Sequence, residues 1–298
     1  MSLAALRSDK STRAALQRVL RERVQLGLAE AQRRDAPPAV HELRKRTKEL
    51  RGLLRLLRPG LTGARELDHR LRNAAQGLSE IRDLEVMSMQ FDTLTAQLRD
   101  PNRFAGLRMQ IFDEYANRCQ SEQADALTEY NSCFRELERE FEEFALKGKA
   151  SHLLWNGIFS TYRKAQGLHM QAIDSLAGDF DATPFHEMRK RVKHHWYQAR
   201  FLARIRKKKM AAHIKRIDDL GEALGDHNDF DVLMEFLDSR EALAPEDIEA
   251  REIFRGHLMA RRRKLATRAL KLADKALARP PDKLVATWQD WWRDWRKG

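Results

Sequence analysis

Cysteine is too scarce for a disulfide framework, because the 298 residues include only two, Cys119 and Cys133. Both fall at apolar positions of one helical pattern, so we expect them in the core of a reduced, intracellular protein. Long apolar runs are also missing. No stretch of 18 or more apolar residues occurs, which excludes a transmembrane helix. We therefore expect a cytoplasmic protein.

Proline is scarce and strand patterns are absent. Each of the eight prolines lies where one helical pattern stops and another begins. No segment alternates apolar and polar residues as a half-buried strand does. In the helix expected over 102–146 the apolar pattern weakens near Ser121, where we expect a break. The sequence predicts an all-α protein with helices over residues 12–33, 39–58, 62–98, 102–146, 151–177, 185–206, 208–239, 246–279 and 283–296.

Negative charge is in deficit. Lysine and arginine number 56 against 44 aspartates and glutamates, which gives a net charge of +12 and favours an anionic partner. The excess lies in two places: residues 41–58 carry +5 and residues 186–209 carry +9. Together these segments exceed the charge of the whole chain, so the remainder is slightly acidic.

The two basic segments are copies of one another. "VHELRKRTKELRGLLRLL" at 40–57 and "FHEMRKRVKHHWYQARFL" at 185–202 share eight of 18 residues at an offset of 145. A later match pairs Asp83 with Asp229, and Arg18 and Arg163 each lie 23 residues before their copy's histidine. We expect an internal duplication that forms two pseudo-symmetric four-helix bundles, residues 1–147 and 148–298, around a basic central cavity.

In both copies the cations share one helix face. At 100° per residue the leucines of the first copy fall on the opposite side, toward the core. Like charges three and four positions apart repel, so such a face favours an anion site, although a solvated basic face is the alternative. Trp196 replaces Arg51 in the second copy. The face consists of His41, Arg44, Lys45, Lys48, Arg51 and Arg55 in one copy and His186, Arg189, Lys190, Lys193, Arg200 and Arg204 in the other.

The length of this face indicates the shape of the anion. From His41 to Arg55 the helix rises about 21 Å, which is long for one phosphate and suits a linear, phosphate-like polyanion. Arginine offers planar forks for phosphate oxygens and lysine a point charge. The repeated Arg18 and Arg163 are expected to line the same cavity. Asp83 and Asp229 are expected to orient the cations from a neighbouring helix.

These residues resemble the conserved histidine α-helical domain family, CHAD. Its pattern of His, Arg three on, Lys or Arg seven on and often Arg ten on reads here His41, Arg44, Lys48, Arg51 and again His186, Arg189, Lys193, with Trp196 departing at the last place. The resemblance covers essentially the whole chain. It implies two four-helix bundles around a basic cavity, binding of inorganic polyphosphate, and frequent location at polyphosphate granules in bacteria.

Other functions find less support. His41 and His186 lie among arginines and lysines, which would repel a divalent cation, and no cluster has metal-ligand spacing, so we expect no metal and no cofactor. No nucleophilic triad, phosphate-binding glycine loop or phosphoryl-transfer motif is present, so we expect no catalysis. The alternatives are a nucleic-acid-binding helical protein and a helical adaptor for an acidic protein.

A tryptophan stripe ends the chain. Its members are spaced as one face of a short C-terminal helix, which usually packs on its own bundle but can also dock a protein partner. The stripe consists of Trp288, Trp291, Trp292 and Trp295.

Overall fold

The computed structural model describes residues 3–33, 40–142, 145–239 and 245–298, and over these ranges the chain is all-α, as predicted. Two isolated residues, Leu61 and Leu146, form a β-bridge, but no strand is present in the described ranges. The elements are α1 (Thr12–Ala31), α2 (Val40–Leu57), α3 (Ala64–Ala74), α4 (Gln76–Thr95), η1 (Pro101–Phe104), α5 (Ala105–Ser121), α6 (Gln123–Glu140), α7 (Ala150–Ala177), α8 (Thr183–Phe201), α9 (Lys207–Asp238), α10 (Pro245–Ala276) and α11 (Pro281–Lys297).

Two of the predicted helices are divided. The break near Ser121 is confirmed, because α5 ends at that residue and α6 starts two residues later. The break at Ala75 between α3 and α4 was not predicted, since the apolar period continues through it. Cys133 is buried as expected, whereas the core position expected for Cys119 is wrong: it is half-buried. Only Leu107 and Ile111 are buried in α5, so this helix packs through a narrow stripe.

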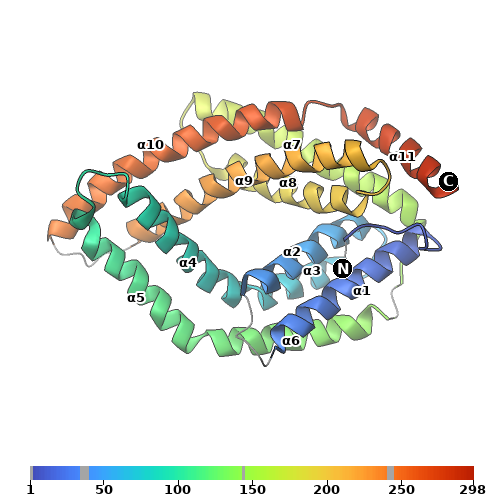
Figure 1. Ribbon diagram of the computed structural model, residues 1–298, viewed down its shortest axis with the longest axis horizontal. Helices are drawn as coiled ribbons and strands as arrows, with labels where there is room; N and C mark the ends of the chain where they lie inside the picture. Colours follow the sequence, from blue (N-terminus) through green and yellow to red (C-terminus); the bar gives the residue numbers. More distant parts are fainter. Residues whose placement is uncertain (1–2, 34–39, 143–144, 240–244) are drawn as a thin grey trace.

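Helices α2 and α8, which carry the two basic segments, pack against each other in the middle of the molecule (Figure 1). The predicted leucine face of α2 is buried, including Leu43, Leu50 and Leu57. The helices come close at Gly52, where an added methyl group would lie 2.9 Å from a ring carbon of Tyr197. Glycine therefore permits the contact between the two copies.

Two groups of buried residues form the core. The larger joins α1, α2, α3 and α6 to α7, α8 and α11. The smaller joins the C-terminal half of α4 and the N-terminal half of α5 to the C-terminal end of α9 and the N-terminal part of α10. Figure 1 shows these four segments extending together from one side of the molecule. Each group combines residues from before and after position 147. The duplication into two bundles and the boundary at 147/148 stay predictions.

The C-terminal tryptophans pack on the protein's own helices. Trp288 is buried and stacks on His195, with ring centroids 5.6 Å apart, and Trp292 meets Trp155 edge-on at 6.2 Å. Trp291 and Trp295 are partly buried against the same core. None of the described helices is both long and apolar enough to cross a membrane.

Candidate functional site

Four cations from the two copies meet between α2 and α8. We call Arg44 and Lys48 of α2, together with Arg189 and Lys193 of α8, the basic cluster. Burial lowers the pKa of Arg44, and the charge of Arg189 lowers it further. Lys48 is affected in the same way by Arg44, Arg189 and Lys193. The fold thus brings together side chains that are about half the sequence apart, as the repeat predicted.

Lys48 lies at the centre of this cluster. Its side chain is exposed to water, yet desolvation by the surrounding protein, followed by the neighbouring cations, lowers its pKa to about 7. The amine of Lys48 is therefore desolvated and surrounded by other cations, although the side chain is accessible. Asp83 partly offsets the shift, but Lys48 forms no ion pair with any residue in the described ranges.

The side chains of Arg189 and Lys193, which belong to α8, lie against α9, where two glycines leave room for them. A methyl group on Gly221 would lie 3.0 Å from Lys193 Cε, and one on Gly225 would lie 3.8 Å from Arg189 Nε. Arg189 Nε is buried without a hydrogen-bond partner. Within the part of the chain that the structure describes, Arg189 also lacks an ion pair. It is therefore a desolvated cation whose charge is left without a direct counterion.

The acids around the basic cluster neutralise it unequally. Asp83 of α4 accepts a hydrogen bond from Arg44 Nη2 at 3.1 Å, and Asp218 of α9 lies 3.5 Å from Lys193 Nζ. Asp229 of α9 lies near Arg189, yet burial raises its pKa and no ion pair joins it to a cation in the described ranges. Asp83 therefore pairs with a cation of the basic cluster, and the orienting role expected for Asp83 and Asp229 stays a prediction.

Farther along α2, two predicted cations share one counterion. Arg51 Nε and Arg55 Nη2 lie 2.7 Å and 3.3 Å from the carboxylate of Asp68 on α3. Arg55 also lies close to Arg191 and His194 of α8: the charge of Arg191 lowers the pKa of Arg55, and the charges of both arginines lower the pKa of His194. Burial is the main reason why the pKa of Arg55 falls. The cationic surface of α2 thus continues beyond the basic cluster, with partial neutralisation.

Trp196, which replaces the fourth cation of the pattern in α8, supports its cationic neighbours. Lys193 Nζ lies 5.2 Å from the centroid of its ring and Arg200 Cζ lies 4.5 Å from it. Arg200 also lies 3.6 Å from the buried carboxylate of Glu49. The same arginine lines an open hollow of about 540 Å³ together with Lys207 and Asp218.

Two predicted lysines have counterions on their own helices. Lys45 pairs with Glu42 at 3.0 Å, and Lys190 pairs with Glu187 at 2.6 Å. His41 lies at the start of α2 and is largely exposed. Partial desolvation, and then the charge of Arg82, lower its pKa. The charge of Lys48 also lowers the pKa of His41, so this histidine lies near the basic cluster.

The two arginines of the preceding helices occupy different environments. Arg18 is held by Asp9 at 2.7 Å and Glu22 at 2.9 Å, so it anchors the segment before α1. Arg163 is exposed on α7 and lies 5.4 Å over the ring of Phe159. The described contacts join neither arginine to the basic cluster, and their expected place in a common cavity stays a prediction.

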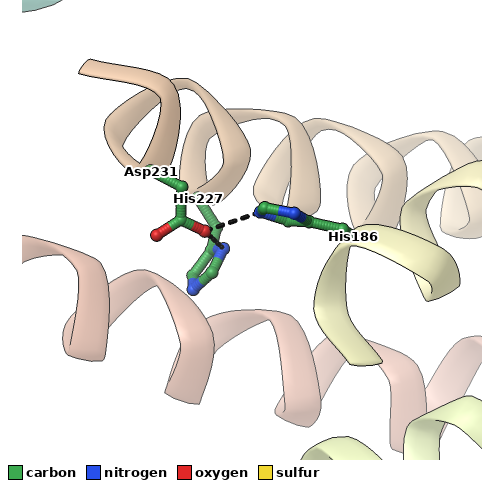
Figure 2. A group of neighbouring side chains, drawn as sticks. All are labelled: His186, His227 and Asp231. Atoms are coloured by element: carbon green, nitrogen blue, oxygen red, sulfur yellow. Dashed lines mark hydrogen bonds and ion pairs between the residues drawn. The ribbon is translucent and has the colours of Figure 1, made fainter. Parts of the chain in front are cut away.

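The second histidine of the pattern has partners that the sequence did not reveal. His186 Nε2 lies 2.7 Å from Asp231 Oδ2, and His227 Nδ1 lies 3.2 Å from the same oxygen. Figure 2 shows the three side chains converging. Arg262 of α10 pairs with the other oxygen of Asp231. The i, i+4 spacing of His227 and Asp231 was a signal in the sequence, but their proximity to His186 depends on the packing of α8 against α9.

Comparisons with known proteins agree with this architecture. A family model described as CHAD domain matches residues 14–238. A crystal structure of the CHAD domain from the plant Ricinus communis is 24% identical, with a TM-score of 0.67 over 93% of this chain and 94% of that chain. PptA from Streptomyces chartreusis is 16% identical, with a TM-score of 0.60 over 89% of this chain and 98% of that chain. No match was found among curated proteins.

Proposed function

Because the chain belongs to the CHAD domain family, as the match over residues 14–238 shows, we propose that it binds inorganic polyphosphate at the basic cluster. The observation that carries the proposal is the meeting of Lys48 and Arg189 without counterions beside Arg44 and Lys193. Like charges that are close together and partly desolvated raise the free energy of the unliganded protein. A bound polyanion relieves this repulsion.

A chain of phosphates fits the arrangement better than a single phosphate does. From Arg44 to Arg55 the axis of α2 rises about 16 Å, and cations from both copies follow this length. The guanidinium groups of Arg44 and Arg189 suit phosphate oxygens, and Lys48 adds a point charge. The cluster therefore holds the middle of the polymer, and Arg51 and Arg55 contact a following segment.

The cationic faces of α2 and α8 offer few groups that could bind nucleic-acid bases. Trp196, the aromatic residue within the cationic face of α8, is already covered by Lys193 and Arg200. Stacking of single-stranded bases requires an accessible aromatic ring. Nucleic acid and an acidic protein partner are therefore outcomes that the experiment must separate from polyphosphate.

The proposed role is binding without catalysis, in the cytoplasm at polyphosphate granules. Its support is the family resemblance together with a site made of cations. A direct test incubates long-chain polyphosphate with the protein and Mg²⁺ and follows chain length on gels. An unchanged length distribution is expected, and progressive shortening that requires the protein would contradict the proposal.

Titrations with defined polymers test the binding itself. Polyphosphates of increasing length and a DNA oligonucleotide of equal charge are titrated at several salt concentrations. We expect affinity to rise with polyphosphate length and to exceed that for DNA at every salt concentration. Equal affinity for the two polymers would favour general polyanion binding. Indifference to both, with saturable binding of an acidic protein, would favour the adaptor.

A further inference from the structure

A second row of cations runs along the outer face of α10, which lies at the edge of the molecule beside α9 (Figure 1). Its members follow one another at spacings of three and four residues. They therefore share an arc of about 80° on the helix, and the row rises about 21 Å. Four of the side chains are exposed, and Arg261 is half-buried. We call Arg261, Lys264, Arg268, Lys271 and Lys275 the outer row.

The outer row lacks counterions. Arg262, a cation of α10 that faces the protein, pairs with Asp231 of α9. No member of the outer row forms an ion pair in the described ranges. Between Glu252 and Asp274 the sequence contains no acid, and Asp274 itself lies 3.3 Å from His169 of α7. Like charges three and four residues apart repel one another, so the row favours a bound anion.

The outer row does not belong to the repeated pattern that supplies the basic cluster. The match to the CHAD domain model ends at residue 238, before α10 begins. None of the five residues that lie 145 positions earlier in the sequence is basic. The row is therefore a feature of the second half of this chain alone.

Two acids of α9 separate the outer row from the basic cluster. Burial raises the pKa of Asp226, and the charges of Arg268 and Arg261 oppose this shift, so Asp226 lies beside the row. Burial also raises the pKa of Asp229, where the charge of Arg189 opposes the shift and that of Asp226 adds to it. A polyanion that crossed α9 from one cationic surface to the other would pass both carboxylates. The two surfaces therefore suit separate segments of polymer.

We propose that the outer row binds a second segment of inorganic polyphosphate, so that one protein molecule joins two chains or two distant parts of one chain. This inference rests on the proposed function, because it assigns the same polymer to a second surface. A protein with two such surfaces cross-links the polymer, and each bound segment raises the effective concentration of the next. Its further function is to condense polyphosphate into larger assemblies.

Other anionic partners fit the outer row less well. A duplex of about 21 Å contains about six base pairs, so each strand turns more than half-way around the axis and leaves the straight row. Single-stranded bases stack on aromatic rings, and α10 contains no Phe, Tyr or Trp after Phe254. The apolar face of α10 packs against α9 and α7, so it is not available to enter a lipid surface. A flexible chain of phosphates can follow the whole row.

Calorimetry at low salt counts the binding surfaces. The ligand is a polyphosphate whose extended length matches the row, because a chain of this length fills one surface and not both. We expect two chains to bind the unchanged protein. One chain should bind the row variant, Lys264→Gln/Arg268→Gln/Lys271→Gln, and one should bind the cluster variant, Arg44→Ala/Arg189→Ala. Because the three row positions are exposed, we expect the row variant to keep its fold, which circular dichroism checks.

The stoichiometry separates failure of this inference from failure of the proposed function. A single chain on the unchanged protein, bound equally well by the row variant, would overturn the second surface and leave the proposed function in place. Two chains on the row variant would overturn it as well. Two chains on the cluster variant would instead contradict the proposed function.

Light scattering with long-chain polyphosphate measures cross-linking. The unchanged protein should raise the scattering, and the row variant should raise it at least tenfold less. The control is Arg99→Gln/Lys147→Gln/Lys149→Gln, which removes the same charge at exposed positions outside both surfaces and should scatter as the unchanged protein does. A DNA duplex of equal charge and vesicles that contain phosphatidylserine are tested in parallel. Equal or stronger binding of either probe through the outer row would overturn polyphosphate as its ligand.

Discussion

Arg44 of α2 donates a hydrogen bond to Asp83 of α4 over 3.1 Å, whereas Arg189, its counterpart in α8, has no such acid partner in the described ranges. The repeated positions thus occupy unequal environments. Arg44 holds two helices together and, under the proposed function, also binds the polyanion, whereas no acid in the described ranges pairs with Arg189. The predicted consequences of substitution differ accordingly.

We expect Arg189→Ala to weaken polyphosphate binding about tenfold or more, because a charge-assisted hydrogen bond contributes roughly 1.5–3 kcal/mol. The melting temperature should stay the same or rise, since an unpaired cation is removed from a repelling cluster. Fluorescence titration and thermal unfolding measure the two effects. Arg206→Ala, at an exposed arginine before α9, is the control and should bind normally.

Arg44→Ala is expected to weaken binding to a similar extent and also to lower stability, because it leaves Asp83 without its partner. The double variant Arg44→Ala/Arg189→Ala should lose most of the affinity while it retains its helicity. Unfolding of the double variant would show that these arginines hold the helices together rather than bind a ligand.

A pair of glycine substitutions tests the position of Lys193. Gly221→Ala places a methyl group 3.0 Å from Lys193 Cε, so the lysine must move and binding should weaken several-fold. Gly256→Ala, in the middle of α10, meets open space. Gly256→Ala should stabilise its helix by about 0.5–1 kcal/mol, because alanine restricts the unfolded chain more than glycine does, and displacement of Lys193 should offset this gain in Gly221→Ala. Equal binding by the two variants would mean that Lys193 does not contact the ligand.

The affinity for polyphosphate should depend on pH through Lys48. Its pKa of about 7 in the free protein results from burial and from Arg44, Arg189 and Lys193, with Asp83 acting in the opposite direction. A polyanion favours the protonated form, so binding takes up a proton above pH 7. We expect affinity to fall by up to about tenfold per pH unit as the pH rises from 7 to 9.

Lys48→Arg is the matched variant, since arginine stays charged over this range and should bind with a flatter pH profile. An identical profile for the two proteins would assign the pH dependence to other groups. In the protein without ligand, stability depends on pH in the opposite direction, because Lys48 holds its proton more strongly in the unfolded chain than in the folded protein. The contribution of Lys48 to the free energy of unfolding therefore rises between the folded pKa of about 7 and the ordinary value of 10.5.

Trp288→Ala should destabilise the protein by about 3–5 kcal/mol, because it removes a buried aromatic ring that stacks on His195. Chemical denaturation followed by circular dichroism measures the loss. Trp291→Ala, at a partly buried position of the same helix, should cost less. Polyphosphate affinity of the folded Trp291→Ala variant should not change, since α11 packs on α7.

Periodicity within single segments was sufficient to predict most of the fold. It located most helices, the buried leucines of α2 and the break near Ser121, because each depends on residues close in the sequence. The break at Ala75 depends on which partners α3 and α4 contact. Such long-range packing leaves no local signal.

The candidate site was predictable to the same degree. The repeat indicated that Arg44 and Arg189 would meet, since equivalent helices in a duplicated fold often pack together. It did not reveal that Asp9 anchors Arg18 or that Asp231 faces His186. These pairs depend on the rotation and relative height of separate helices, which the pattern of one helix does not encode.

The close contact of Gly52 with Tyr197 has a consequence for synthesis on the ribosome. The face of α2 that receives this ring stays uncovered until α8 has emerged, about 145 residues later. At ordinary translation speeds this interval lasts several seconds or more, and the nascent first half exposes apolar surface throughout it.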